Sequence, residues 1–306
     1  MSPIYPRNIL KEQALNGSWE TNENLQELVL HIKNICSTFP SLVMAYSADE
    51  DIAECSLSIA RTITEWGINV FIPDYPVPVS ALSYAITTRN MPIGIYIEKN
   101  DDYVSIIPIS THGGLFNEMD LQGGYVEKAK KHGVIGSTEL ISGYVKHLGG
   151  FADPFIEEGI SYSKLDIPFK ELERSLRNNE HLKSLFEVNK DGPAARLNNN
   201  GSLITISQKQ LTLSTEELSI KLAEYLSKER FASGTILCPT SAIRNFEKYG
   251  EVKGIDGNVF DMNYSAGFSD LFLGMWPDKA IALQGSSCFG DGLLAALYYI
   301  EALRSN

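Results

Sequence analysis

Two charged side chains on either side of a short turn are the first residues in this chain that could do chemistry. Asp191 and Arg196 bound the hexapeptide Asp191-Gly192-Pro193-Ala194-Ala195-Arg196. A carboxylate on a rigid glycine turn can help to hold a hard dication such as Mg²⁺, which takes several oxygen ligands at once. Pro193 and Ala195 have no side-chain oxygen, so Asp191 supplies the only carboxylate of the hexapeptide. An ordinary surface turn, with Arg196 in a salt bridge inside its domain, is the alternative.

A second charged stretch, Glu98-Lys99-Asn100-Asp101-Asp102-Tyr103, is predicted to be a loop. Phosphoryl transfer through an enzyme needs an oxygen nucleophile held in line with the substrate phosphate, and this stretch contains no serine, threonine or histidine. Asp101 and Asp102 could bind a cation together with Asp191, but adjacent carboxylates on an exposed turn are usually only solvated. We interpret the nearby Ser105 as a strand residue rather than a nucleophile.

The composition is that of an ordinary globular protein, with 43% hydrophobic and 21% charged residues among 306. This length suits two or three α/β units. No apolar run approaches the ~18 residues of a membrane span, and the first residues have no apolar core of the kind found in signal peptides. We therefore expect a cytoplasmic protein that does not bind a membrane.

The formal net charge of −12 bears on the partners that the chain could bind. The one small basic group, Lys128, Lys130 and Lys131, is too short to form an electrostatic footprint for nucleic acid or an anionic membrane. No basic cluster stands out that would bind a phosphorylated substrate against this negative field. The cysteines are scattered singly, which favours buried free thiols over a zinc cluster or a disulfide framework. They are Cys36, Cys55, Cys238 and Cys288.

The first half of the chain alternates between strand and helix patterns, as in an α/β fold. Residues 42–45 and 70–72 are short apolar runs that suit buried parallel strands. Between them, one apolar helical face ends at Gly67. A second helix over residues 80–88 and a third strand over residues 93–97 complete half of a doubly wound layer with right-handed crossovers. The residues of the first helical face are Ile52, Cys55, Ile59 and Ile63.

The second half contains more widely separated elements. Helices are predicted near residues 137–148 and 169–178, and Asn198-Asn199-Asn200-Gly201 predicts a hairpin turn. Ser214-Thr215-Glu216-Glu217 has the form of a capping box, and it opens a helix with a leucine-lined face. Asp291 is predicted to cap a final helix. The apolar face of that helix contains Leu293, Ala296, Leu297 and Ile300.

Several of these segments, in this order, resemble the α-D-phosphohexomutases, the phosphoglucomutase and phosphomannomutase superfamily. Pro76-Val77-Pro78-Val79-Ser80-Ala81-Leu82-Ser83-Tyr84-Ala85-Ile86 is similar to the P-V-P-T-P-A-L-S-F-A-I stretch of that family. The hexapeptide over residues 191–196 resembles its D-G-D-A-D-R metal loop. Gly285-Ser286 and Gly290-Asp291-Gly292-Leu293-Leu294-Ala295-Ala296-Leu297 resemble its sugar-binding loop and the helix that follows. The likeness covers most of residues 40–303.

The resemblance implies α/β/α domains with mixed sheets. We expect three such domains, over residues 1–136, 137–234 and 235–306. The second is expected to be shortened, and the fourth domain of the family enzymes is expected to be absent, together with its loop for the non-reacting phosphate.

At the nucleophile the chain departs from the family. Family enzymes carry a phosphoserine in a T-A-S-H-N-P loop, which corresponds to residues 98–103 here. Glu98, Lys99 and Asn100 therefore belong to a degenerate nucleophile loop, in which we assign no catalytic residue. The arginine of the family's first-domain G-x-D-x-R motif falls at Asp49, which reverses the charge at a place that faces phosphate.

The metal and sugar positions depart from the family as well. Two of the three aspartates that hold Mg²⁺ in family members fall at Pro193 and Ala195. Asp191 is thus the only retained ligand, and neither Mg²⁺ nor another cofactor is expected. Both glutamates of the G-E-E-S-G sugar loop are replaced, although Gln284 and Ser286 can still hydrogen-bond. The candidate ligand-binding residues are Asp191, Arg196, Gln284 and Ser286.

Together these changes predict a phosphohexomutase-like pseudoenzyme, related to the isomerases of carbohydrate metabolism. We expect it to lack phosphosugar mutase activity and to retain a role in binding or assembly. A sugar phosphate, a second copy in a homo-oligomer and a protein partner are its candidate partners. The alternative is an enzyme that acts on sugar phosphates in an interdomain cleft, either as a phosphoglucomutase/phosphomannomutase-type isomerase or with altered chemistry. Such an enzyme would use Asp191, Arg196, Lys99 or the Asp101–Asp102 pair.

Overall fold

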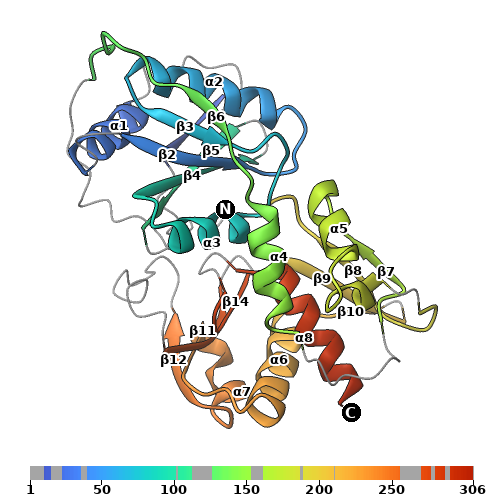
Figure 1. Ribbon diagram of the computed structural model, residues 1–306. Coiled ribbons are helices and arrows are strands. Elements are labelled where there is room, and N and C mark those ends of the chain that lie inside the picture. The colour runs from blue at the N-terminus through green and yellow to red at the C-terminus, as the bar shows by residue number, and fades with distance from the viewer. Residues whose placement is uncertain are drawn as a thin grey trace. The chain divides into compact units, whose positions relative to one another are not determined.

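The computed structural model describes residues 10–14, 23–35, 40–100, 103–111, 126–152, 161–186, 189–209, 211–255, 270–276, 280–286 and 290–305. These residues form a mixed α/β fold with three mixed β-sheets (Figure 1). The chain divides into two compact units between Leu140 and Ile141. We call the described residues before this boundary the N-terminal unit and those after it the C-terminal unit.

The N-terminal unit is built on a six-stranded sheet with the order β1-β5-β4-β2-β3-β6. β2 pairs in parallel with β3 and β4, and β3 pairs in parallel with β6, whereas β5 is antiparallel to β4 and β1. The predicted strands over residues 42–45, 70–72 and 93–97 are thus confirmed. The strands are β1 (Leu10–Ala14), β2 (Ser41–Tyr46), β3 (Asn69–Ile72), β4 (Ile93–Asn100), β5 (Tyr103–Ser110) and β6 (Ile135–Ser137). The helices are α1 (Glu23–Ile35), α2 (Ile52–Glu65) and α3 (Val79–Arg89).

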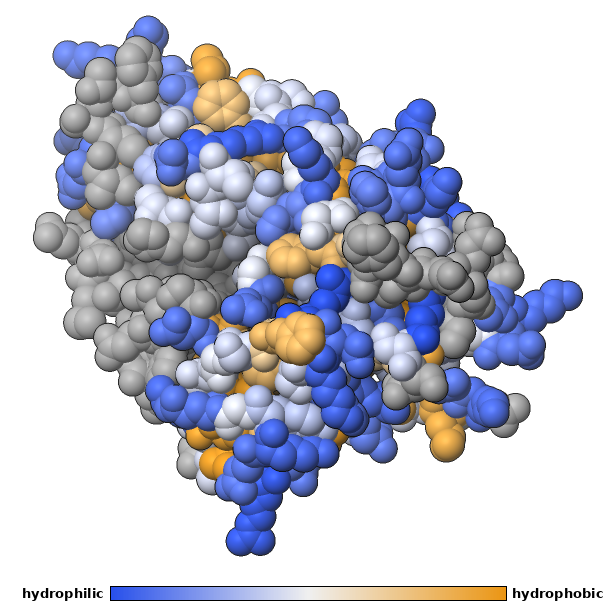
Figure 2. Space-filling model, turned by 60° about the horizontal axis from the view of Figure 1, so that its bottom comes forward, coloured by the Kyte–Doolittle hydropathy of each residue, from blue (hydrophilic) through white to orange (hydrophobic). Residues whose placement is uncertain are grey.

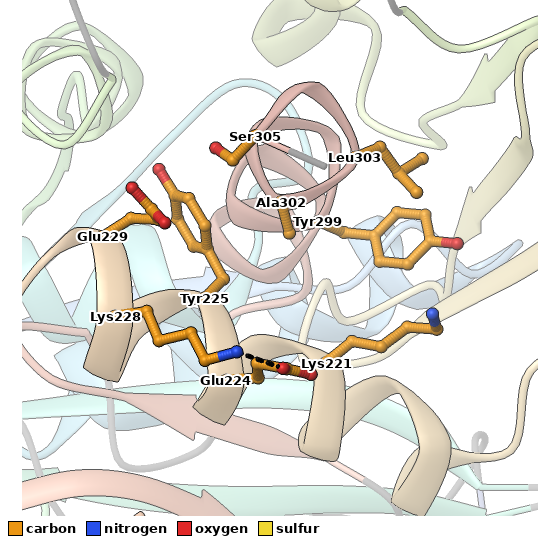
Figure 3. A pocket seen from close by; sticks show the side chains of 9 residues that line it. All are labelled: Lys221, Glu224, Tyr225, Lys228, Glu229, Tyr299, Ala302, Leu303 and Ser305. Atoms are coloured by element: carbon orange, nitrogen blue, oxygen red, sulfur yellow. Dashed lines mark hydrogen bonds and ion pairs between the residues drawn. The ribbon is translucent and has the colours of Figure 1, made fainter.

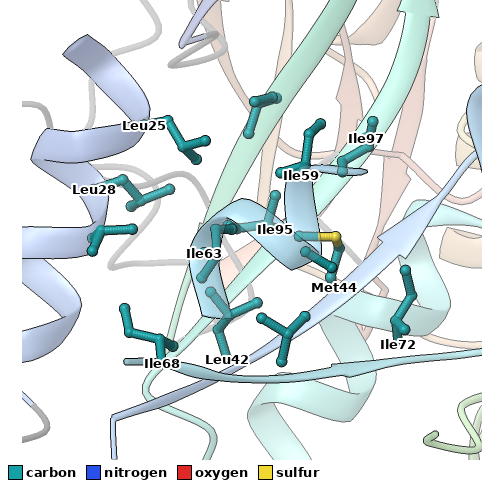
Figure 4. Close-up of a cluster of buried hydrophobic side chains, with 14 of the residues drawn as sticks. Leu25, Leu28, Leu42, Met44, Ile59, Ile63, Ile68, Ile72, Ile95 and Ile97 are labelled. Atoms are coloured by element: carbon teal, nitrogen blue, oxygen red, sulfur yellow. The ribbon is translucent and has the colours of Figure 1, made fainter. Parts of the chain in front are cut away.

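Strand β2 lies at the centre of this sheet and is buried on both faces. Leu42 and Met44 belong to an apolar cluster that also contains residues of α1 and α2, including the predicted helical face of α2 (Figure 4). Val43 and Ala45 alternate with them on the opposite face and are buried as well. Helix α3 lies on that side of the sheet (Figure 1). Coverage of both faces explains why this strand is a continuous apolar run.

Residues 98–100 do not form a loop, contrary to our prediction. They continue β4, and only residues 101 and 102, which lie outside the described residues, separate β4 from β5. Polar side chains suggested a loop, but the end of a hairpin tolerates them because the backbone pairing supplies the order. Ser105 is buried within β5, as predicted for a strand residue. The pairs at this end of the hairpin are Glu98 with Ser105, Lys99 with Val104, and Asn100 with Tyr103.

The C-terminal unit contains two four-stranded sheets, with the orders β10-β9-β8-β7 and β12-β11-β13-β14. β7 and β8 are parallel, as are β11 and its neighbours β12 and β13, and the other pairs are antiparallel. The strands of the first sheet are β7 (Lys164–Asp166), β8 (Ala194–Leu197), β9 (Ile204–Gln208) and β10 (Leu211–Thr212). Those of the second are β11 (Thr235–Pro239), β12 (Glu251–Ile255), β13 (Leu271–Met275) and β14 (Ile281–Leu283). The α-helices are α4 (Ile141–Gly149), α5 (Lys170–Arg177), α6 (Thr215–Glu229), α7 (Ile243–Phe246) and α8 (Gly292–Arg304), and the 3₁₀ helices are η3 (Lys183–Phe186) and η4 (Thr240–Ala242).

Most of the local signals in this half are confirmed. Helix α5 fills the range predicted as 169–178, and the Asn-rich turn joins the antiparallel strands β8 and β9. The capping box of α6 is present, with the Ser214 hydroxyl accepting from the Glu217 N–H. The helix predicted near residues 137–148 begins later, at Ile141, because residues 135–137 form β6 and pair with β3.

Cys55 and Cys238 are buried free thiols, as predicted, and burial raises the pKa of each to about 11. Cys36 and Cys288 lie outside the described residues. None of the described helices has the length and apolar character that a membrane span requires.

Phe231 has a backbone conformation that does not suit its side chain. It follows the C-cap of α6 with φ of 51°, in the left-handed region that favours glycine, and it is 85% exposed. A bulky residue there is strained by about 1–2 kcal/mol. Because the ring is exposed, burial of the side chain offsets little of this strain.

We expect Phe231→Gly to raise the free energy of unfolding by about 1 kcal/mol, because glycine adopts this backbone conformation without a clash. Phe231→Ala is the matched control, since it removes the ring but keeps the Cβ atom that causes the strain. Urea denaturation of the three chains measures the effect. A glycine variant no more stable than the alanine variant would show that φ is not the source of strain.

Candidate functional site

The hexapeptide over residues 191–196 runs from a tight turn into strand β8. Asp191 is exposed, and its backbone N–H donates to Asn189 Oδ1 over 3.1 Å. Gly192 lies so close to the backbone of Ser161 that a Cβ atom on Gly192 would be 2.0 Å from the Ser161 carbonyl oxygen. Only glycine fits this approach. The shape of the turn therefore reflects its own backbone packing and does not require a bound ion.

Pro193 and Ala195, which stand at the positions of the family's other two aspartates, are both buried. Ala195 is 4% exposed and pairs with Leu165 of β7 and Ile206 of β9. A carboxylate at this position would face the core and lose its hydration. The hexapeptide therefore does not fit a Mg²⁺ site. Among the residues that the structure describes, no group of three or more His, Cys, Asp or Glu side chains is arranged to hold a metal ion.

Arg196 forms the salt bridge that the sequence offered as an alternative to ligand binding. Its Nε atom lies 3.8 Å from Oδ2 of Asp166, its register partner on the parallel strand β7. Both side chains are exposed, at 76% and 45%, so the pair contributes little to stability.

The loop over residues 284–286 is closed by hydrogen bonds within itself. The Ser286 hydroxyl donates to the Leu283 carbonyl over 2.8 Å and accepts from the Leu283 N–H over 2.8 Å. The single donor of this hydroxyl is therefore used inside the loop. Gln284 is exposed, and its backbone N–H donates to the Phe272 carbonyl over 3.2 Å. The parts of the loop that face solvent are thus the Gln284 side chain and Gly285.

Helix α4 holds this loop and the start of α8 through two side chains that sequence analysis did not identify. His147 Nε2 lies 3.1 Å from the Gly285 carbonyl oxygen. Tyr144, one turn earlier, donates its hydroxyl to both carboxylate oxygens of Asp291, over 2.8 and 2.9 Å. The only sequence feature that could have indicated a shared role for Tyr144 and His147 was their spacing of three residues, which places both on one helical face.

Asp291 is buried, and its carboxylate caps α8 by accepting from the Leu294 N–H over 3.0 Å. Burial raises the pKa of Asp291, and the hydrogen bonds from Leu294 and Tyr144 oppose that rise. A carboxylate of the chain itself thus occupies the electropositive N-terminus of α8. An external phosphate would meet that charge rather than free N–H groups.

A second buried carboxylate, Glu301, lies near the other end of α8. Arg230 Nη2 is 2.7 Å from Glu301 Oε2, and the Tyr225 hydroxyl donates to the same oxygen over 2.8 Å. Arg230 also donates to the Phe151 carbonyl over 2.9 Å. This cluster joins α6, α8 and the end of α4, and its full set of partners indicates a structural role.

The N-terminal unit has its own place where a ligand could bind, outside the carboxyl ends of β2 and β4. The strand order reverses there, because β3 follows on one side of β2 and β4 on the other, and open α/β sheets bind ligands at such points. Ser47 donates its N–H to the Ile97 carbonyl over 2.9 Å and its hydroxyl to Asp49. Asp49 therefore lies beside the end of β4 that carries Glu98 and Lys99. Asp49, Glu98 and Lys99 together carry one net negative charge at this edge, which does not favour a phosphate.

A small pocket of about 80 Å³ lies between α6 and α8 (Figure 3). Two lysines and two glutamates line it, and one pair of them, Lys228 and Glu224, forms an ion pair of 2.6 Å. No residue predicted for the functional site takes part. Its balanced charge does not single out a class of ligand. The lining residues are Lys221, Glu224, Tyr225, Lys228, Glu229, Tyr299, Ala302, Leu303 and Ser305.

No family model matches the chain, and no curated protein matches its sequence. Solved structures do match. A protein assigned as a phosphomannomutase from Thermus thermophilus has a TM-score of 0.73 at 12% identity, over 92% of this chain and 75% of that one. A phosphoglucomutase/phosphomannomutase family protein from Burkholderia thailandensis has a TM-score of 0.66 at 11% identity, over 96% and 75%. The open form of parafusin, a phosphoglucomutase from Paramecium, has a TM-score of 0.65 at 11% identity, over 100% and 71%.

The chain therefore has the fold of the phosphohexomutase superfamily, as its motifs predicted. At these identities the likeness concerns the fold.

We expect Ala195→Asp, which would replace a missing metal-loop carboxylate, to lower the free energy of unfolding by at least about 2 kcal/mol. The reason is that the new carboxylate would be buried without a partner. Ala194→Asp is the matched control, because Ala194 is only half-buried and alternates to the other face of β8. Urea denaturation with and without Mg²⁺ tests the effect. If Mg²⁺ restores the stability of the Ala195→Asp variant, the loop can still form a metal site.

The raised pKa of Asp291 predicts a pH dependence of stability. The folded chain holds the proton more tightly than the unfolded chain, whose carboxyl keeps the ordinary pKa of 3.8. The stability of the wild type, measured against the non-ionising Asp291→Asn variant, should therefore fall as the pH rises above 3.8 and level off above the raised folded pKa. Urea denaturation of both chains from about pH 3 to about pH 7 measures the difference. A relative stability that rises with pH would contradict the assignment.

Proposed function

We propose that this protein is a phosphohexomutase-like pseudoenzyme, which lacks phosphosugar mutase activity and retains a binding role. The observation that carries the proposal is the β4–β5 hairpin. Where family enzymes have the loop that carries the phosphoserine, this chain has two strands paired up to Asn100 and Tyr103. Residues 98–100 are fixed in a ladder, and none of them offers a hydroxyl nucleophile.

The hexapeptide supports the same conclusion at a second position. Two buried apolar residues, Pro193 and Ala195, replace carboxylates, and Asp191 alone cannot supply the several oxygen ligands that Mg²⁺ takes. Loss of metal stabilisation and loss of the nucleophile would each be expected to remove several kcal/mol of transition-state stabilisation. Two independent losses argue against a single substitution in an otherwise working enzyme.

The alternative, an enzyme with altered chemistry, depended partly on Arg196. The salt bridge of Arg196 with Asp166 gives that side chain a structural partner, and this weakens the alternative. Lys99 stays a candidate only as a charged residue at the end of β4. No nucleophile and general base pair is found among the candidate residues that the structure describes.

We favour ligand binding over assembly as the retained role. On the face drawn in Figure 2, the coloured side chains are mostly hydrophilic, and the apolar ones form small groups between them. A broad apolar patch would mark an interface between subunits. Among the described residues, the exposed large hydrophobic side chains include only one adjacent pair, Val134 and Ile135, and the others are Leu57, Tyr103, Leu211 and Phe231. The loop over residues 284–286 is the candidate binding element, with a sugar or sugar phosphate as its ligand.

Purified protein incubated with glucose 1-phosphate, mannose 1-phosphate or glucosamine 1-phosphate, Mg²⁺ and a hexose bisphosphate activator should form no isomer. The control is Asp191→Ala, which removes the one retained metal-loop carboxylate. Coupled assays and NMR of the sugar phosphates both detect the product. Turnover clearly above that of the control would show that the chain is an active mutase.

A further inference from the structure

We propose that helix α4 sets the conformation of the 284–286 loop, with His147 and Phe151 as positioning residues, and that this control extends to the buried Arg230–Glu301 ion pair. The inference rests on the binding role proposed above for the same loop. It names the residues that govern that role. All of these residues lie within the C-terminal unit.

His147 holds the peptide of Gly285 through a side-chain hydrogen bond. A carbonyl oxygen can only accept, so the proton of the 3.1 Å hydrogen bond is on His147 Nε2. Gly285 has φ of 80°, in the left-handed region, so its peptide has the orientation of a tight turn. The imidazole thus selects this turn over other backbone conformations that glycine would permit.

The Phe151 ring packs against Gly285 of the loop and against the His147 ring. A Cβ atom on Gly285 would lie 2.8 Å from Phe151 Cζ, so the ring and the glycine are in close contact. The Phe151 ring meets the His147 ring edge to face, with centroids 4.8 Å apart. Movement of Phe151 would therefore disturb both its packing against Gly285 and the position of His147, which donates to the Gly285 carbonyl.

The backbone of Phe151 is in turn fixed by the buried ion pair. Its carbonyl accepts from Arg230 Nη2, the same nitrogen that binds Glu301. The Glu301 side chain is only 3% exposed, so moving Arg230 away would leave a buried carboxylate without its ion-pair partner. The hold on Phe151 is consequently much firmer than a single surface hydrogen bond.

These contacts matter for binding because the loop keeps few groups for a ligand. The Ser286 hydroxyl donates to Leu283 and the Gly285 carbonyl accepts from His147, so recognition by residues 284–286 must come mainly from the side-chain amide of Gln284, which the Gly285 turn positions. His147 and Phe151 stabilise that turn. A site built this way binds through preorganisation, since the loop is already ordered when the ligand arrives.

Amide hydrogen exchange of the ligand-free chain, followed by NMR, tests the positioning role. The amides of Leu283, Gln284 and Ser286 report on the loop, because each donates a hydrogen bond there. We expect His147→Ala to accelerate their exchange about three- to tenfold, as loss of one hydrogen bond predicts. The amide of Leu297, buried within α8, is the reference that should not change.

Two further variants separate the hydrogen bond from general packing. His147→Gln keeps an N–H donor and should restore most of the protection, whereas Lys146→Ala, at the neighbouring exposed residue, should behave as wild type. If the loop exchanges at the wild-type rate in His147→Ala, or if His147→Gln is as fast as His147→Ala, the positioning role of His147 is wrong.

The coupling to the ion pair is tested with Glu301→Gln and Arg230→Lys. Glu301→Gln removes the buried charge, and Arg230→Lys keeps a charge but loses the forked geometry that binds Phe151 and Glu301 together. Each should accelerate loop exchange relative to Leu297. Should Glu301→Gln fail to fold, Arg230→Lys still gives the answer. Unchanged loop exchange in a folded variant overturns the coupling.

Ligand binding is measured separately, so the two proposals can fail independently. Glucose 1-phosphate is titrated into the wild type and His147→Ala while the side-chain amide signals of Gln284 are followed. A shift in the wild type that weakens in His147→Ala supports both proposals. No shift in either chain, together with accelerated exchange in His147→Ala, overturns the binding role at this loop and leaves the positioning role intact.

Discussion

The C-terminal unit depends on one constraint, the burial of helix α8 around its whole circumference. Residues 292–302 are all buried, so the polar groups of this helix need protein partners in place of water, and the Tyr299 hydroxyl is the exception that has no hydrogen-bond partner. Asp291 caps one end, Glu301 carries a charge near the other, and the Ala296 carbonyl between them accepts a tyrosine hydroxyl over 2.8 Å. These partners come from α4, from the segment before β7, and from α6 with its C-cap, so the helix fixes where these parts of the unit pack. The partners are Tyr144, Tyr162, Tyr225 and Arg230.

The same rule about buried charge applies to the candidate site. A carboxylate is tolerated in the interior only with a full set of partners, as at Asp291 and Glu301. Ala195 lies in a strand with apolar neighbours, and nothing there would satisfy an aspartate. Residues 194–196 and 98–100 lie in regular β structure. Among the candidate residues that the structure describes, Asp191 and Gln284 are exposed outside the strands.

The sequence predicted those parts of the fold that depend on local signals. The apolar face of α2, the capping box at Ser214 and the Asn-rich turn all lie within single elements, where periodicity and capping chemistry decide the structure. The errors arose where pairing with another strand decides the structure. Residues 135–137 form a strand only because β3 lies beside them, and residues 98–100 are ordered by β5. Propensity is weak in such short segments.

The candidate site was predictable to a smaller extent. Resemblance drew attention to Asp191, Arg196, Gln284 and Ser286, but not to the contacts that decide what each can do. That Arg196 would meet Asp166 depends on a parallel register, and that Ser286 would use its donor inside the loop depends on turn geometry. Tyr144 and His147 could not be assigned from sequence, because their partners are about 140 residues away, at Asp291 and Gly285.

The β4–β5 hairpin also limits how this protein can evolve. Point substitutions can return a serine or an aspartate to a loop that still exists, but they cannot lengthen a connection of two residues. An inserted loop would first have to break the ladder at Asn100 and Lys99, and each such step loses stability before any activity is gained. Under the proposed function, selection for mutase activity could therefore not readily restore a nucleophile loop at this position.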